Sequence, residues 1–143
     1  NDPLLKASYS GISSRHTKAH FTRATLEGVA FSLKDCMNTV QELGMEMSRL
    51  RIIGGGAKGM LWRQIVADVL GMRLDDSSFG TAMLTAVGIG WFRNYEEAVD
   101  CCVEIDSVSE PHPEQRKIYE GLFRKYKDIH DALEGIYKKD YSI

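Results

Sequence analysis

Three consecutive glycines, Gly54–Gly56, mark the stretch of this sequence best suited to bind a ligand. They follow the short apolar run Leu50–Ile53 and precede Met60–Gly71, which has the pattern of an amphipathic helix. A strand that breaks into glycines before a helix is typical of phosphate- and nucleotide-binding turns, because a ligand can approach the bare backbone and the helix start offers free N–H groups. Lys58 adds a cation here. The pattern favours a nucleotide site over a tight turn that needs glycine only for its backbone angles.

The same glycines also fit a dinucleotide-binding pattern. Gly54, Gly56 and Gly59 are spaced as Gly-x-Gly-x-x-Gly, and Asp75 or Asp76 follows about 20 residues later, where an acidic side chain could hold ribose hydroxyls. That fingerprint usually follows the first strand of its domain, whereas here a strand and a long helix come first. A nicotinamide-dinucleotide-binding domain of the Rossmann type is therefore the alternative. The simpler interpretation of the two aspartates is the solvated end of a strand.

The other reactive side chains form no recognisable catalytic set. His16 and His20 have the spacing of a metal-binding pair, but no third ligand lies nearby in the sequence, so no metal site is predicted. The chain has an odd number of cysteines, and two of the three are adjacent: Cys36, Cys101 and Cys102. This pattern indicates reduced thiols of a cytosolic protein rather than a disulfide framework. No nucleophile has a partner at a recognisable spacing. We predict no catalytic residue in this chain.

The hydrophobic pattern predicts alternating strands and helices around the glycine turn. Strands are expected at residues 7–13, 49–53 and 72–76, with a minor strand at 103–105, and helices at 17–43, 60–70, 79–92, 95–101 and 113–137. A break of the first helix near Gly28 is left open, and Asn94 is expected to cap the helix that follows it. This order predicts an α/β domain with a mostly parallel sheet.

Two helices carry apolar stripes that are expected to face the core. The stripe of the first helix consists of Leu26, Val29, Ala30, Leu33, Met37 and Val40, and that of the last helix of Ile118, Leu122, Ile129, Leu133 and Ile136.

Composition excludes several classes of partner. The 143 residues suffice for one domain with a core, and the formal net charge of −2 comes without a basic stripe, so no nucleic-acid partner is expected. No apolar run approaches the roughly 20 residues that span a bilayer, so no membrane partner is expected either. The first residues are polar and include no initiator methionine, which favours a cytoplasmic fragment of a longer protein.

Two further stretches share one family pattern with the glycine turn. Ala7-x-Tyr9-x-Gly11-Ile12 is followed, after seven residues, by His20-Phe21-x-x-Ala24-Thr25-Leu26-Glu27. At every defined position this resembles the second signature of the FGGY carbohydrate kinases. The stretch Gly54–Gly71 resembles the adenosine motif and following helix of that family, particularly in its xylulokinases, and Phe79–Leu84 resembles its later Gly-Ala-Ala helix.

The resemblance implies the C-terminal, nucleotide-binding domain of such a kinase over residues 1–143. Its fold would be the actin-like (ribonuclease-H-like) ATPase fold, an α/β domain with a mixed sheet flanked by helices. Matched by position, Gly55, Gly56 and Ala57 would approach the phosphates and ribose of ATP, and Lys58 would either neutralise phosphate or add surface charge. Met60 falls where related glycerol kinases have an asparagine that touches the adenine.

The intact protein would transfer the γ-phosphoryl group of Mg²⁺-bound ATP to a hydroxyl of a pentulose, with D-xylulose the expected substrate and D-xylulose 5-phosphate the product. The sugar and the catalytic aspartate would belong to an N-terminal domain absent from this chain, so the chain alone would be inactive. A homodimer is left open. The alternatives are the Rossmann-type domain and a non-catalytic module that kept the fold.

Overall fold

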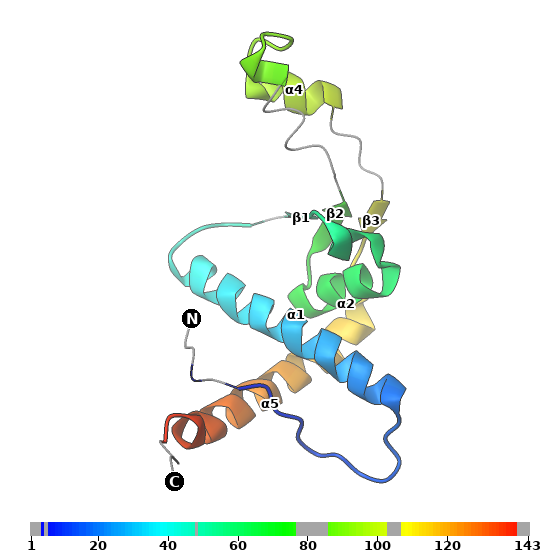
Figure 1. Ribbon diagram of the computed structural model, residues 1–143, viewed down its shortest axis with the longest axis vertical. Coiled ribbons are helices and arrows are strands. Elements are labelled where there is room, and N and C mark those ends of the chain that lie inside the picture. The colour runs from blue at the N-terminus through cyan, green and yellow to red at the C-terminus, as the bar shows by residue number, and fades with distance from the viewer. Residues whose placement is uncertain (1–3, 5, 48, 77–85, 103–106, 140–143) are drawn as a thin grey trace.

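A computed structural model of the chain describes residue 4 and residues 6–47, 49–76, 86–102 and 107–139. Figure 1 shows its elements, which are in chain order helix α1 (Lys18–Glu42), strand β1 (Arg49–Ile52), the 3-10 turn η1 (Gly55–Lys58), helix α2 (Met60–Leu70), strand β2 (Arg73–Asp76), helix α4 (Tyr95–Cys102), strand β3 (Ser107–Ser109) and helix α5 (Pro113–Tyr137). The order of elements is that of an α/β domain.

The described strands form one mixed sheet in the order β1-β2-β3. Strands β1 and β2 run parallel, with Leu50 opposite Leu74, and β3 runs antiparallel to β2, with Ser109 opposite Leu74. Leu74 and Ser109 are both buried, so this face of the sheet covers the core. In Figure 1, α1, α2 and α5 lie on one side of the sheet and α4 lies beyond it.

The core lies between α1, α2, α5 and the sheet. Its buried members are Ala30, Phe31, Ile65, Val66, Ala67, Val69, Leu74 and Tyr119. The ring of Phe31 on α1 contacts the rings of Tyr119, Phe123 and Tyr126 on α5, with centroids 6.0, 6.0 and 5.5 Å away. This aromatic cluster joins the two long helices.

Local signals place the helix ends where the sequence predicts them. The N–H of Thr17 donates to Nδ1 of His20 at 3.1 Å at the start of α1, and α1 continues through Gly28 without a break. Gly71 ends α2 with φ 67°, a left-handed conformation that favours glycine. Oδ1 of Asn94 accepts the N–H of Glu97 at 2.8 Å, which confirms the predicted cap of α4.

Two predicted elements differ from the structure, and a third lies outside the described residues. The strand expected at residues 7–13 is wrong, because the segment has no regular secondary structure and pairs with no described strand. Tyr9 holds it to α1 instead, through a 2.6 Å hydrogen bond to Thr25 and edge-to-face contact with Phe21. The helix expected over 79–92 ends at Gly88 within its described part, before Gly90 at φ 81°, and residues 77–85 lie outside the described residues. The minor strand at 103–105 also lies outside them, and β3 begins at Ser107.

The predicted apolar stripes are only partly correct. Ala30 is buried on α1, but Val29 and Leu33 are 49% and 43% exposed. On α5 the expected Ile118, Leu122 and Ile136 are exposed, and the residues that meet the core are Tyr119, Phe123 and Tyr126. The aromatic side of α5 faces the core because Phe31 of α1 lies opposite it.

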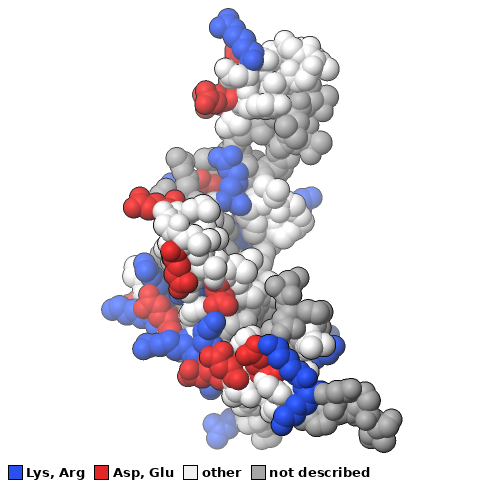
Figure 2. Space-filling model, turned by 90° about the vertical axis from the view of Figure 1, so that its left-hand side faces the viewer, with Lys and Arg blue, Asp and Glu red and all other residues white. Residues whose placement is uncertain are grey.

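Charged side chains of both signs are interspersed on the face shown in Figure 2. Among the described residues, no helix is both long and apolar enough to cross a membrane.

Candidate nucleotide-binding turn

The glycine run folds into a turn between β1 and α2. Gly54 has φ 83°, a conformation in which other residues are strained, and its carbonyl accepts the N–H of Ala57 at 3.1 Å. The carbonyl of Gly56 accepts the N–H of Gly59 at 3.3 Å. These two bonds close the 3-10 turn η1 directly before α2 begins.

The three glycines are needed for different reasons. Gly54 supplies the positive φ angle. A Cβ atom on Gly56 would lie 3.3 Å from Nε1 of Trp62, so this glycine makes room for a side chain of the protein itself. A Cβ atom on Gly55 would meet nothing within 4 Å. A ligand can therefore approach the bare backbone at Gly55.

Ala57 anchors the turn to the body of the domain. Its side chain is buried, its N–H donates to Gly54, and its carbonyl accepts a hydrogen bond from Nη1 of Arg63 on α2. Both polar backbone groups of Ala57 are thus already used, and its neighbours Gly55, Gly56 and Lys58 provide the exposed part of the turn.

The exposed side of the turn is suited to an anion. Gly55 and Gly56 open η1, and the structure gives their N–H groups no acceptor among the described residues. The first amides of α2 follow, with no acidic residue in the first turn of that helix and the Lys58 ammonium exposed beside it. Free N–H groups, the positive end of a helix and a cation together favour phosphate. The Met60 side chain, 77% exposed, lies at the same helix start.

Asp75 does not form the solvated strand end that the sequence suggests. Its side chain is only 1% exposed, and Oδ1 pairs with Nε of Arg73 at 2.8 Å. This carboxylate raises the pKa of the Arg73 guanidinium. A buried, paired carboxylate is poorly placed to bind ribose, which weakens the dinucleotide alternative.

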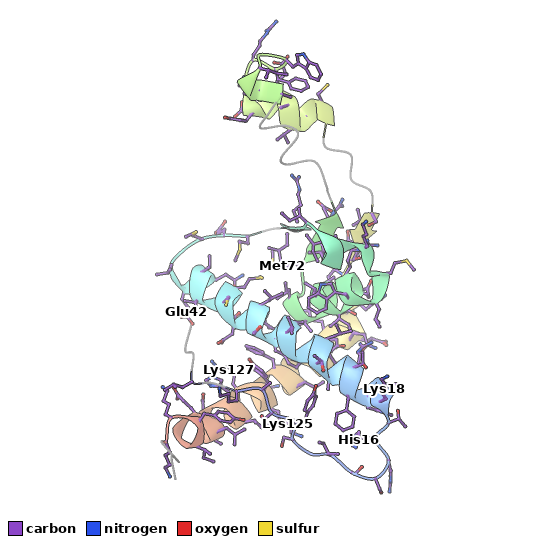
Figure 3. The ribbon with its side chains drawn as sticks, viewed as in Figure 1. His16, Lys18, Glu42, Met72, Lys125 and Lys127 are labelled. Carbon is purple, nitrogen blue, oxygen red and sulfur yellow. The ribbon has the colours of Figure 1, made fainter. Side chains whose placement is uncertain are left out.

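The side chains of His16 and His20 accept hydrogen bonds from the backbone. Nδ1 of His16 accepts the N–H of Ser13 at 2.9 Å, and Nδ1 of His20 accepts that of Thr17 at 3.1 Å. The described residues contain no group of three or more potential metal ligands. Figure 3 shows His16 and Lys18 at the start of α1, at the opposite end from Glu42.

A polar cluster that the sequence did not predict ties α2 to the start of α5. Oδ1 of the buried Asp68 accepts the N–H of His112 at 2.7 Å and Nε2 of Gln64 at 3.0 Å. Gln64 also donates to the carbonyl of Glu110 at 2.8 Å. The one feature of the sequence that could have indicated this cluster is a carboxylate, Asp68, inside the otherwise apolar run Ile65–Leu70. The cluster fixes α2, and hence the helix start beside the turn.

A separate groove of about 530 Å³ lies between α1, α5 and the N-terminal segment. Its lining includes Val29, Leu122, Ile129, Tyr126 and Lys125, and no residue of the glycine turn.

Comparison with known proteins gives the class to which this fold and turn belong. Residues 1–89 match the family model of the FGGY family of carbohydrate kinases, C-terminal domain. Since the match covers more than half of the chain, the chain belongs to this family. The family resemblance of the motifs is confirmed.

Individual relatives and solved structures agree with that assignment. A xylulose kinase of Staphylococcus epidermidis is 37% identical over 141 residues, covering 94% of this chain and 28% of the relative. The crystal structure of a xylulose kinase from Rhodospirillum rubrum has a TM-score of 0.85 at 24% identity, covering 96% of this chain and 29% of that one. A glycerol kinase structure from Plasmodium falciparum with ADP has a TM-score of 0.69 at 23% identity, covering 85% of this chain and 26% of that one.

These likenesses confirm the predicted fold class, the actin-like ATPase fold with a mixed sheet and flanking helices. The chain spans just over a quarter of the length of the relatives that it matches.

Proposed function

We propose that this chain is the nucleotide-binding domain of an ATP-dependent sugar kinase. The observation that carries the proposal is the exposed glycine turn at the start of α2, with free N–H groups at Gly55 and Gly56 and the Lys58 cation beside them, in a chain of the FGGY family. The phosphates of ATP bind at these amides and at the helix start, and Lys58 neutralises their charge. Met60 borders the adenine, and Ala57 holds the turn from inside.

The intact protein transfers the γ-phosphoryl group of Mg²⁺-bound ATP to a hydroxyl of a pentulose, in our proposal D-xylulose. The name xylulose kinase carried by several relatives supports this substrate. Positioning and charge neutralisation supply most of the rate in phosphoryl transfer, so the turn contributes by fixing the phosphates in line with the sugar. A further, N-terminal domain supplies the sugar site and the general base, and the reaction takes place in the cytoplasm.

Calorimetric titration of this chain with Mg-ATP and with NADH tests the proposal. We expect saturable binding of Mg-ATP and none of NADH. Gly55→Val is expected to weaken Mg-ATP binding at least about tenfold, which corresponds to about 1.4 kcal/mol, because its side chain fills the space where the phosphates approach. The fold tolerates this change, since no atom lies within 4 Å of the new Cβ.

Gly121→Ala is the matched control, because Gly121 also has open space around it but lies on α5. It should leave nucleotide binding unchanged. Binding of NADH without competition by ATP would favour the dinucleotide alternative, and binding of neither nucleotide would contradict the proposal. In a coupled assay with ketopentoses, we expect phosphorylation by the full-length protein and none by this chain alone.

A further inference from the structure

The indole of Trp62 lies against the glycine turn. Trp62 is the third residue of α2, and its Nε1 and Cδ1 are 3.3 and 3.5 Å from the position that a Cβ atom on Gly56 would take. Its own Cβ lies 3.5 Å from the corresponding position on Gly59. The same side chain packs, partly buried, against the hydrophobic core. Trp62 therefore connects two glycines of the turn with the interior of the domain.

Few other side chains can hold this turn in shape. Of the residues Gly54–Gly59, only Ala57 and Lys58 have side chains, and Lys58 is exposed. The hydrogen bond from Arg63 fixes the carbonyl of the buried Ala57. The backbone at Gly56, one of the two residues with unpaired N–H groups, has the Trp62 indole as its neighbour, and the backbone at Gly59 has the Cβ of the same residue. A glycine-rich backbone has many accessible conformations, so such a neighbour decides which one persists.

We propose that Trp62 is a positioning residue for the nucleotide: its indole holds the backbone of η1 in the shape that presents the Gly55 and Gly56 amides to phosphate. Glycine is required at position 56 to make room for this ring, and at position 55 to make room for the ligand. The binding part of this inference rests on the proposed function, whereas the part that concerns the shape of the turn does not.

The test is a double-mutant cycle of Gly56→Ala and Trp62→Phe. Phenylalanine keeps an aromatic ring in the core and removes the Nε1 edge that a methyl group on residue 56 would meet, so this variant is expected to fold. Hydrogen exchange of the Ala57 and Gly59 amides, whose hydrogen bonds close the turn, reports the shape of the turn when it is measured without ligand. We expect Gly56→Ala to accelerate that exchange about tenfold in the parent chain and by less than about twofold in the Trp62→Phe background.

The affinity for Mg-ATP is measured for the same four proteins. We expect Gly56→Ala to weaken binding about tenfold in the parent chain and by less than about threefold when Trp62→Phe is also present. Gly55→Ala is the control, because a Cβ there meets no atom, and its effect should be the same in both backgrounds. If Trp62 only stabilised the core, Trp62→Phe would lower the free energy of unfolding, and the effect of Gly56→Ala would be the same with and without it.

The two proposals fail differently. If the parent chain binds no Mg-ATP, the proposed function fails, and the exchange measurement still decides whether Trp62 sets the turn. If the parent binds Mg-ATP but Gly56→Ala has the same effect on exchange and on affinity in both backgrounds, the role of Trp62 is overturned and the proposed function stands.

Discussion

At the scale of single residues, Asp68 determines how firmly α2 is held against α5. The carboxylate is buried, and its Oδ1 accepts the backbone N–H of His112 at 2.7 Å directly before α5 begins at Pro113. The amide of Gln64 joins the same oxygen. Because the glycine turn leads directly into α2, this one side chain also supports the position of the candidate site.

Replacing Asp68 should therefore be costly. We expect Asp68→Ala to lower the free energy of unfolding by about 1–3 kcal/mol, because the N–H of His112 and the side-chain amide of Gln64 would lose the charged acceptor that they share. Urea denaturation followed by circular dichroism measures this difference. Asp128→Ala, at an exposed position of α5, is the control and should change stability by less than about 0.5 kcal/mol. Equal effects of the two changes would show that the Asp68 cluster contributes nothing specific.

The sequence predicted where the candidate site lies but not how its residues divide the work. The sequence does not distinguish the three glycines. In the structure Gly54 has a positive φ angle, Gly55 has open space around it, and Gly56 lies against Trp62. Asp75 was expected either to hold ribose or to be solvated, but its side chain is buried and paired with Arg73 two residues earlier on the same strand. Such requirements depend on neighbours in space, which spacing along the chain does not reveal.

At the scale of elements, local signals predicted the ends of α2, β1 and β2 to within one residue but did not reveal which segments pair or which side of a helix is buried. Helix α2 was predicted with its observed bounds, because the glycines before it and Gly71 after it define both ends. The segment 7–13 has a strand-like pattern, but a strand exists only when another strand pairs with it, and none of the described strands does. Likewise α5 carries two apolar sides, and the position of Phe31 on α1 decides which one is buried.

Two glycines in different elements should respond in opposite ways to alanine. Gly121 lies inside α5 with no atom within 4 Å of a new Cβ, so Gly121→Ala should stabilise the chain by about 0.5–1 kcal/mol. Gly71→Ala should destabilise it, because Gly71 has φ 67° and its Cβ would lie 2.8 Å from Nε of Arg116. Thermal unfolding of both variants measures the difference, and a stabilising Gly71→Ala would contradict the left-handed end of α2.

At the scale of the whole molecule, one aromatic cluster joins the first and last helices of the described chain. Phe31 contributes from α1, and Tyr119, Phe123 and Tyr126 contribute from α5. The Tyr119 hydroxyl is hydrogen-bonded to Glu27 at 2.9 Å and accepts a hydrogen bond from Nη2 of Arg23 at 2.5 Å. Placing phenols in a core makes the stability of the whole domain depend on pH, because an ionised phenolate is poorly solvated there.

Burial raises the pKa of Tyr126 above its ordinary value of 10.0, and it does the same for Tyr119. A raised pKa in the folded state means that each phenol holds its proton more tightly in the folded chain than in the unfolded chain. The resulting stabilisation is fully present below the unfolded pKa and is lost as the pH rises through the folded pKa. The domain should therefore lose stability on the alkaline side of pH 10.

Tyr126→Phe isolates one of these groups, because it keeps the ring beside Phe31 and removes the ionisable hydroxyl. The free energy of unfolding of the variant should decline less steeply above pH 10 than that of the parent chain. The ion pair of Lys127 with Asp35, which raises the pKa of the Lys127 ammonium, is lost over the same alkaline range in both proteins. Urea denaturation from pH 7 to about pH 11 measures both curves. Parallel curves would show that the phenol of Tyr126 is equally solvated in the folded and unfolded chains, and the α1–α5 interface would then be more open to water than its aromatic packing indicates.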